Sequence, residues 1–167
     1  MKHLLTTILC LTIWAGTQQT LAKSRTLPGP YTARTIKVID ADTLRVFVEV
    51  WPMDFKRVDV RLEGIDTPEK RSTGCTALYG GKAADVPAHI KQREKQLGLK
   101  ATEFVKAHVK PQDTLLLTDV KLGKYAGRAV GRLALSDGRD LADLLIQHGH
   151  AVTYDGGTKA APWCLDN

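Results

Sequence analysis

Two short acidic segments carry the side chains whose types and spacing are suited to chemistry. Asp40 and Asp42 stand two residues apart in the run Asp-Ala-Asp-Thr, and Asp66 begins the run Asp-Thr-Pro-Glu. Two carboxylates so spaced are also a common turn pattern. Pro68 disfavours helical backbone at Thr67, so the Thr67 carbonyl and the Asp66 carboxylate can be aimed at one place. Brought together with Asp42, they would form an open, all-oxygen site suited to calcium and to a phosphate oxygen.

Two arginines accompany these acids. Arg61 precedes Asp66 by five residues, and Arg128 follows Gly127. The transition state of phosphodiester hydrolysis gathers negative charge on its equatorial oxygens, and a guanidinium fork can pair with two of them at once. Arg132 lies four residues after Arg128 and would point the same way in a regular strand. We choose Arg128 because the preceding glycine lets the backbone approach a ligand closely.

The elements that must position these residues are mostly short strands. Side chains alternate along a strand, so Arg61 and Asp66 would point to opposite faces of a regular one. If both serve one site, the strand must twist or bulge between them, and Gly64 is the expected place. The sequence patterns predict strands over 32–40, 43–50, 57–65, 114–120 and 128–135, a helix with an apolar stripe over 97–108, and a short helix over 140–149 capped by Asp140. The charged stretch 87–98 is either an extension of the first helix or an excursion from the fold.

The order of three strands, a helix, two strands and a helix predicts an α+β, mainly β fold. We expect a five-stranded OB-type barrel with two packed helices, although a small open sheet would give the same pattern. The chain has 167 residues and a formal net charge of +6. A basic balance suits a polyanionic partner, and it is also compatible with ordinary solubility charge.

The first residues are typical of an export signal. Lys2 and His3 precede an apolar run from Leu4 to Gly16 that is short for a membrane span. We expect residues 1–22 to be a signal peptide, 23–30 a leader segment and 31–167 the folded domain. An uncleaved anchor is the alternative. We therefore expect a protein exported to the periplasm or the cell exterior, without stable membrane insertion after signal cleavage. We also expect it to be monomeric.

Two cysteines, Cys75 and Cys164, remain outside the signal segment. An even count permits a disulfide in an oxidising compartment, so we expect these two to pair. The sequence has no Cys-x-x-Cys motif and no cluster of histidines and cysteines, which argues against a zinc site.

The combined pattern resembles the staphylococcal nuclease family. It consists of Asp40-x-Asp42-Thr43, then Arg61, then Asp66-Thr67-Pro68-Glu69, then Tyr125 followed by Gly127-Arg128. The resemblance covers roughly residues 31–154, and the combination is far more specific than the Asp-Thr-Pro-Glu run alone.

This resemblance implies an OB barrel and a role for each residue. Asp42 and Asp66 would bind Ca²⁺ through their carboxylates and Thr67 through its carbonyl, with Asp40 close by and not bound to the metal. Glu69 would orient or deprotonate the attacking water, as a general base does. Arg61 and Arg128 would hold the phosphate. The substrates would be DNA and RNA, cut with little sequence preference to leave 3′-phosphate ends.

The substrate pocket departs from the family pattern. The resemblance implies that Tyr125 and Tyr154 contact the nucleotide. The family motif is Tyr-Gly-Arg, whereas Ala126 here adds a residue between Tyr125 and Gly127, and Tyr154 matches the family tyrosines only loosely.

Two other functions compete with the enzyme. OB barrels often bind single strands without catalysis, so a non-catalytic exported nucleic-acid-binding protein is the first alternative. Such a binder is expected to carry aromatic residues on its strands, and only Phe47 and Phe55 lie near those positions. An exported calcium-binding structural protein would explain the acids but would give Arg61 and Arg128 no role.

Overall fold

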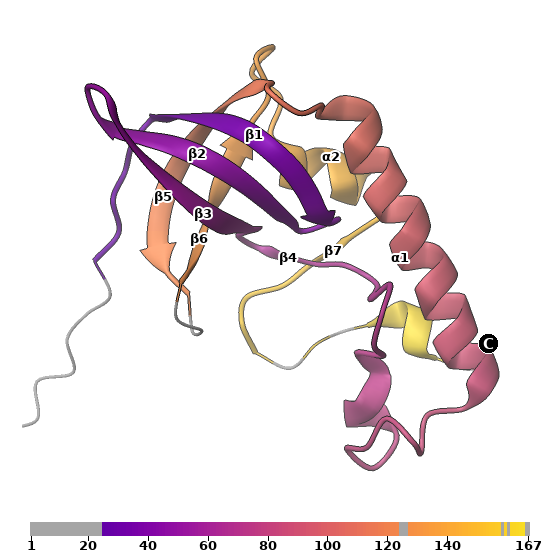
Figure 1. The fold of residues 1–167 in the computed structure, drawn as a ribbon. Helices are drawn as coiled ribbons and strands as arrows, with labels where there is room; N and C mark the ends of the chain where they lie inside the picture. The colour runs from indigo at the N-terminus through magenta and orange to yellow at the C-terminus, as the bar shows by residue number, and fades with distance from the viewer. Residues whose placement is uncertain (1–24, 124–126, 158, 160, 166–167) are drawn as a thin grey trace, which may run out of the picture.

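The computed structural model describes residues 25–123, 127–157, 159 and 161–165. Five of its strands close into a barrel in the order β1-β2-β3-β6-β5, and a separate two-stranded sheet joins β4 and β7 (Figure 1). The elements are β1 (Tyr31–Asp40), β2 (Thr43–Trp51), β3 (Asp54–Leu62), β4 (Ile65–Asp66), α1 (Ala88–His108), β5 (Thr114–Leu122), β6 (Arg128–Ala134), α2 (Leu141–Gln147) and β7 (Val152–Thr153). The predicted barrel with two helices is confirmed, and the open sheet is excluded because β5 pairs with β1.

Strand pairing follows from the alternation in the sequence. The strands β1, β2 and β3 form an antiparallel meander, β3 runs parallel to β6, and β5 is antiparallel to both its neighbours. Inward-facing aliphatic side chains fill the barrel and pack against one face of each helix, which removes their apolar surface from water. This core includes Leu44, Val46, Val60, Leu62, Ala101, Val105, Leu115, Leu117, Leu133, Leu141 and Leu145.

Helix α1 is one continuous element of 21 residues. The charged stretch 87–98 is therefore an extension of the predicted helix. In Figure 1, α1 runs alongside the barrel and continues past it. Helix α2 begins where predicted, because the Asp140 carboxylate accepts hydrogen bonds from the N–H groups of Ala142 and Asp143. No helix in the described ranges is long and apolar enough to cross a membrane.

A turn interrupts the extended backbone between β3 and β4. Such a turn is needed if the side chains of Arg61 and Asp66 are to reach the same site. The predicted strand over 57–65 is wrong at both ends, since β3 begins at Asp54 and ends at Leu62. Gly64 has a φ of +81°, a left-handed conformation that L side chains rarely adopt. After this turn Asp66 lies in β4, which pairs with β7 and not with the barrel.

A second, smaller core holds the far half of α1. Two short 3₁₀ helices, Cys75–Leu78 and Pro162–Cys164, contribute the disulfide between Cys75 and Cys164. The side chain of Arg93 on α1 donates hydrogen bonds to the Trp163 carbonyl, at 2.9 and 3.1 Å. The covalent bridge spans 89 residues of sequence and ties the C-terminal segment to the loop before α1.

A histidine cluster at the end of α1 should make the fold sensitive to acid. The Phe104 ring lies 4.4, 4.9 and 4.6 Å from the rings of His108, His148 and His150. Burial, followed by repulsion from His148 and Lys100, lowers the pKa of His150. Because the folded pKa lies below the unfolded one, the unfolded chain binds protons more readily. The contribution to stability is therefore complete above the unfolded value, about 6.5, and is lost as pH falls through the folded value.

We expect the Tm of the folded domain to fall between about pH 7.5 and 5, because His150 must be charged in this environment. The His150→Gln variant should lose less Tm over the same interval. Thermal melts followed by circular dichroism at several pH values measure this difference. Parallel Tm curves for the two proteins would contradict it.

Candidate active site

One guanidinium joins the two predicted metal-binding carboxylates. Arg61, at the end of β3, places Nη1 2.5 Å from Asp42 Oδ2 and Nη2 3.5 Å from Asp66 Oδ1. Asp42 and Asp66 are only 5% and 2% exposed. Buried carboxylates are costly unless they are paired, so their convergence on one cation marks a built site and not a solvated surface. Thr67, the third predicted ligand, is also buried.

Two lysines complete the charge balance at this end of the barrel. Lys159 Nζ lies 2.7 Å from Asp66 Oδ1. Asp40 pairs with Lys70 at 3.3 Å, and the Lys70 ammonium also donates to the Ile39 carbonyl. Asp40 is thus held beside the Asp42–Arg61–Asp66 group by a different partner.

Glu69 lies half-buried in the same field. Burial is the largest effect on its pKa and raises it, and repulsion from Asp42 and Asp40 adds to the rise, while Lys159 and Arg61 oppose it. A carboxylate with a raised pKa is a stronger proton acceptor than an ordinary one. The position therefore suits a general base.

The segment that follows Glu69 is held by a buried acid that the motif does not contain. The Glu94 side chain on α1 is 1% exposed. Its carboxylate accepts hydrogen bonds from the N–H groups of Glu69 at 3.3 Å and Gly74 at 3.0 Å, and from the Thr73 hydroxyl at 2.6 Å. Cys75 Sγ, one half of the disulfide, lies 3.2 Å from the same carboxylate. Helix α1 thus fixes the backbone that carries Glu69.

Gly98 allows α1 to approach that backbone closely. A Cβ at this position would lie 2.6 Å from the Pro68 carbonyl oxygen, 2.8 Å from the Glu69 carbonyl carbon and 2.8 Å from the Lys70 nitrogen. All three are backbone atoms, so they cannot move aside as a flexible side chain can.

Under the hydrolytic role that the sequence resemblance implies, we expect Gly98→Ala to displace Glu69 and lower turnover by roughly 10- to 100-fold, since a misplacement of about 1 Å costs about that much. Steady-state hydrolysis of a labelled oligonucleotide measures the loss. Leu99→Ala, at the exposed neighbouring position, is the matched control and should retain its activity. Normal turnover in a folded Gly98→Ala protein would contradict this role for α1.

A cleft opens beside these acids. Its lining includes Arg61, Glu69, Arg128, Tyr154 and Lys159. Arg128 begins β6, where its Cα lies opposite that of Asp59 on β3. The structure thus brings both predicted phosphate-binding arginines to the cleft together with Glu69. The Tyr154 hydroxyl donates to the Gly157 carbonyl at 3.0 Å, and Tyr125 falls outside the described residues.

Arg132 forms ion pairs with acids at the start of α2. Its Nη2 lies 3.2 Å from Asp140 and 3.1 Å from Asp143, the N-cap and first-turn acids of α2. Arg128 lines the cleft with Arg61 and Glu69, and Arg132 is not among the described lining residues, so the choice of Arg128 as the phosphate-binding arginine of β6 agrees with the geometry.

The comparison with protein families bears on what this arrangement does. A family described as staphylococcal nuclease homologue matches residues 59–162. The chain belongs to the staphylococcal nuclease family. No curated protein matches the chain significantly. The matched region runs from β3 to the second 3₁₀ helix, so it includes Arg61, Asp66, Glu69 and Arg128 and leaves out Asp42.

The donor set of this nuclease-family chain fits calcium. Asp42 and Asp66 offer carboxylate oxygens, the donors that hard cations prefer. In the described residues, the one group of three acidic, cysteine or histidine side chains with ligand atoms within 4.8 Å of one another is Cys75, Glu94 and Cys164. A calcium site at Asp42 and Asp66 would thus have few carboxylate ligands, which leaves coordination positions for water and phosphate.

Sequence reasoning missed Glu94 and Lys159. A signal for Glu94 was present, because it stands four residues after Ile90 and four before Gly98 on the buried stripe of α1. An acid on an apolar stripe needs partners, and here the partners are backbone N–H groups. Nothing around Lys159 in the sequence distinguishes it from the other lysines.

Proposed function

We propose that this protein is a calcium-dependent nuclease that hydrolyses phosphodiester bonds of DNA and RNA with little sequence preference and leaves 3′-phosphate ends. The observation that carries the proposal is the Arg61 guanidinium, which joins the buried carboxylates of Asp42 and Asp66 while lining one cleft with Glu69 and Arg128. Membership of a nuclease family supports the reaction class.

Each side chain has a part in the proposed reaction. Asp42, Asp66 and the Thr67 carbonyl would hold Ca²⁺, which when bound supplies charge to stabilise a phosphate oxygen. Glu69 takes a proton from the attacking water, and its raised pKa favours that transfer. Arg61 and Arg128 hold the equatorial phosphate oxygens as negative charge builds on them. The water oxygen bonds to phosphorus, the bond to the 5′ oxygen breaks, that oxygen takes up a proton from solvent water, and Glu69 returns its proton to solvent.

A non-catalytic nucleic-acid-binding barrel is the alternative. It accounts for the basic charge and for the cleft. It gives no reason for burying Asp42 and Asp66 beside Arg61, because phosphate binding alone is weakened by acids in the same place. The buried acids therefore favour the enzyme.

We also propose that the protein is exported and works as a monomer in the periplasm or outside the cell. The charged and apolar pattern of residues 1–22 supports export. The Cys75–Cys164 disulfide supports an oxidising compartment.

Removal of calcium is expected to stop cleavage. The mature protein should cut a labelled oligonucleotide in calcium and lose that activity when a chelator is added, because the phosphate then loses its metal partner. Magnesium should substitute poorly, since it demands near-ideal octahedral geometry at shorter distances and gives up its waters reluctantly, whereas Ca²⁺ accepts irregular coordination. Gel analysis of the products measures both effects. Full activity in excess chelator would sink the metal part of the proposal.

A further inference from the structure

The outer surface of β1, β2 and β3 carries aromatic and basic side chains in register. Residues paired across antiparallel strands share a face of the sheet. Phe47 on β2 lies opposite Arg34 on β1 and opposite Arg57 on β3, and Glu49 lies opposite Phe55. Phe47 is 43% exposed and Phe55 is 53% exposed. We call the surface formed by Arg34, Phe47, Phe55 and Arg57 the outer face.

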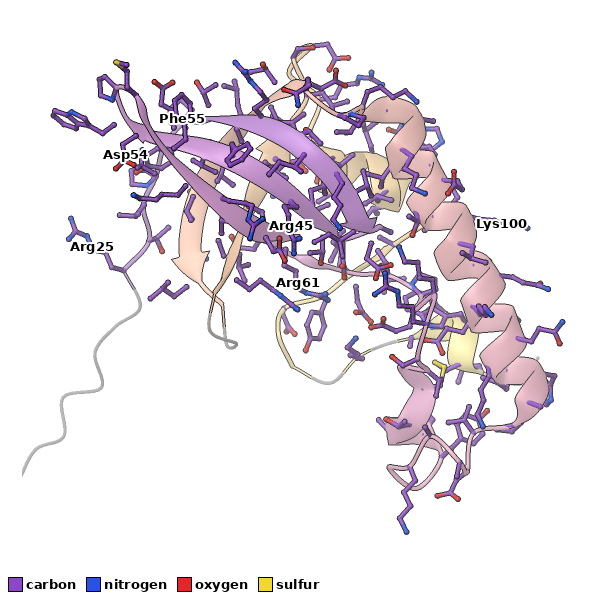
Figure 2. The ribbon with its side chains drawn as sticks, in the orientation of Figure 1. Arg25, Arg45, Asp54, Phe55, Arg61 and Lys100 are labelled. Atoms are coloured by element: carbon purple, nitrogen blue, oxygen red, sulfur yellow. A yellow bond between two sulfur atoms is a disulfide. The ribbon has the colours of Figure 1, made fainter. Side chains whose placement is uncertain are left out.

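The outer face continues into the candidate active site. Phe55, Arg57, Asp59 and Arg61 occupy alternate positions of β3, so all four lie on the same side of the strand. Figure 2 shows Arg61 at the site end of this line and Phe55 toward the other, with Arg45 nearer Arg61. Arg61 follows Phe55 by six positions along β3, which is about 20 Å at about 3.3 Å per residue.

The charge of the outer face suits a polyanion. Arg34 and Arg57 are both exposed and flank the Phe47 position. The acid nearest to the site, Asp59, is neutralised by Arg45, which contacts both of its oxygens at 2.6 and 2.9 Å. A strand leaving the cleft would therefore meet a neutral pair first, followed by two arginines with an aromatic ring between them, and Glu49 lies beyond them, opposite Phe55.

We propose that the outer face binds the single-stranded nucleic acid that extends from the cleft. Bases would stack on Phe47 and Phe55 while Arg34 and Arg57 pair with the phosphates, which is how single strands are held without sequence preference. Duplex DNA hides its base faces inside the stack, so it cannot make the same contacts. The inference rests on the proposed nuclease function and extends it by naming where the substrate lies beyond the scissile bond.

A membrane is the other partner that an exposed apolar hairpin can suit. Trp51 and Met53, at the turn between β2 and β3, are 73% and 90% exposed. The observations favour nucleic acid, because Phe47 and Phe55 alternate with arginines along the strands and the line of side chains ends at Arg61. An interfacial hairpin would need only its tip to be apolar.

The test measures binding in chelator, so it does not depend on hydrolysis. The protein lacking residues 1–22 is titrated into a fluorescent twelve-nucleotide oligothymidine and followed by anisotropy. Phe47→Ala combined with Phe55→Ala should weaken binding at least about fivefold, since loss of a stacked base costs about that much or more. Leu78→Ala combined with Leu99→Ala removes side chains of similar exposure elsewhere and should leave the affinity unchanged.

Two further measurements separate the possible outcomes. Cleavage of a dinucleotide in calcium, which reaches only the cleft, should have the same kcat/KM in the Phe47→Ala/Phe55→Ala protein. Arg57→Gln should lower the salt dependence of oligothymidine binding by about one counterion. This measurement tests the proposal even if the aromatic double variant does not fold.

An unchanged oligothymidine affinity in the folded double variant, or an unchanged salt dependence in Arg57→Gln, would overturn the proposal. So would loss of binding to vesicles of phosphatidylcholine and phosphatidylglycerol with no loss of oligothymidine binding, which would assign the hairpin to a membrane. Absence of all cleavage in calcium would overturn the nuclease function, and the binding results would still decide the role of the outer face.

Discussion

Glu69→Gln should lower the single-turnover rate of oligonucleotide hydrolysis by about 100- to 10,000-fold, the usual contribution of a general base. Glutamine keeps the shape of the side chain but cannot accept the proton of the attacking water. Burial, followed by repulsion from Asp42, raises the pKa of Glu69, and a raised pKa makes the carboxylate a better proton acceptor. Rapid-quench kinetics at saturating calcium isolates the chemical step from product release.

The matched control for this variant is Glu63→Gln. Glu63 also lines the cleft, but its carboxylate pairs with Lys121 on β5 and lies outside the Asp42–Arg61–Asp66 group. Its rate should stay within a few-fold of the parent. If Glu69→Gln were the milder of the two substitutions, Glu69 could not be the base.

Arg128→Lys is expected to reduce turnover about 100- to 1,000-fold, because loss of one preorganised donor to the transition state typically costs about that much. Lysine keeps the positive charge but loses the fork that pairs with two phosphate oxygens. The KM should change less than kcat, since the contact strengthens as charge accumulates on the phosphate. Steady-state kinetics over a range of oligonucleotide concentrations separates the two parameters.

Arg132→Lys provides the comparison within the same strand. Arg132 binds Asp140 and Asp143 at the start of α2, so its replacement should slightly weaken the fold and leave turnover nearly unchanged. Circular dichroism establishes that both variants are folded. A large loss in Arg132→Lys with near-normal turnover in Arg128→Lys would show that Arg132, and not Arg128, holds the phosphate.

The strands and the acidic motif could be predicted because their signals are local. Alternating apolar residues define β2 and β3, and Gly64 stands where Arg61 and Asp66 must be brought to one side. The prediction for 57–65 failed at its ends for a physical reason. Asp54, Phe55 and Lys56 have no buried face, yet they extend the strand by pairing with β2 in the hairpin.

The supports of the site were harder to predict because they depend on distant contacts. The strands β4 and β7 are two residues long, and each is defined by its pairing with the other, which is distant in the sequence. The Glu94 carboxylate accepts hydrogen bonds from the N–H groups of Glu69 and Gly74, which lie 20 or more residues away in the sequence. Lys159 reaches Asp66 across 93 residues, and no pattern near either residue encodes that distance.

The most direct test of the nuclease function is cleavage of plasmid DNA and of RNA in calcium by the purified protein lacking residues 1–22, with Glu69→Gln protein prepared in parallel. The proposed function predicts that the parent degrades both polymers to fragments whose 3′ ends must be treated with a phosphatase before a polymerase can extend them. The variant should leave both polymers largely intact over the same time. Intact polymers with the parent protein, or equal degradation by the parent and the variant, would contradict the assignment of this site as a nuclease.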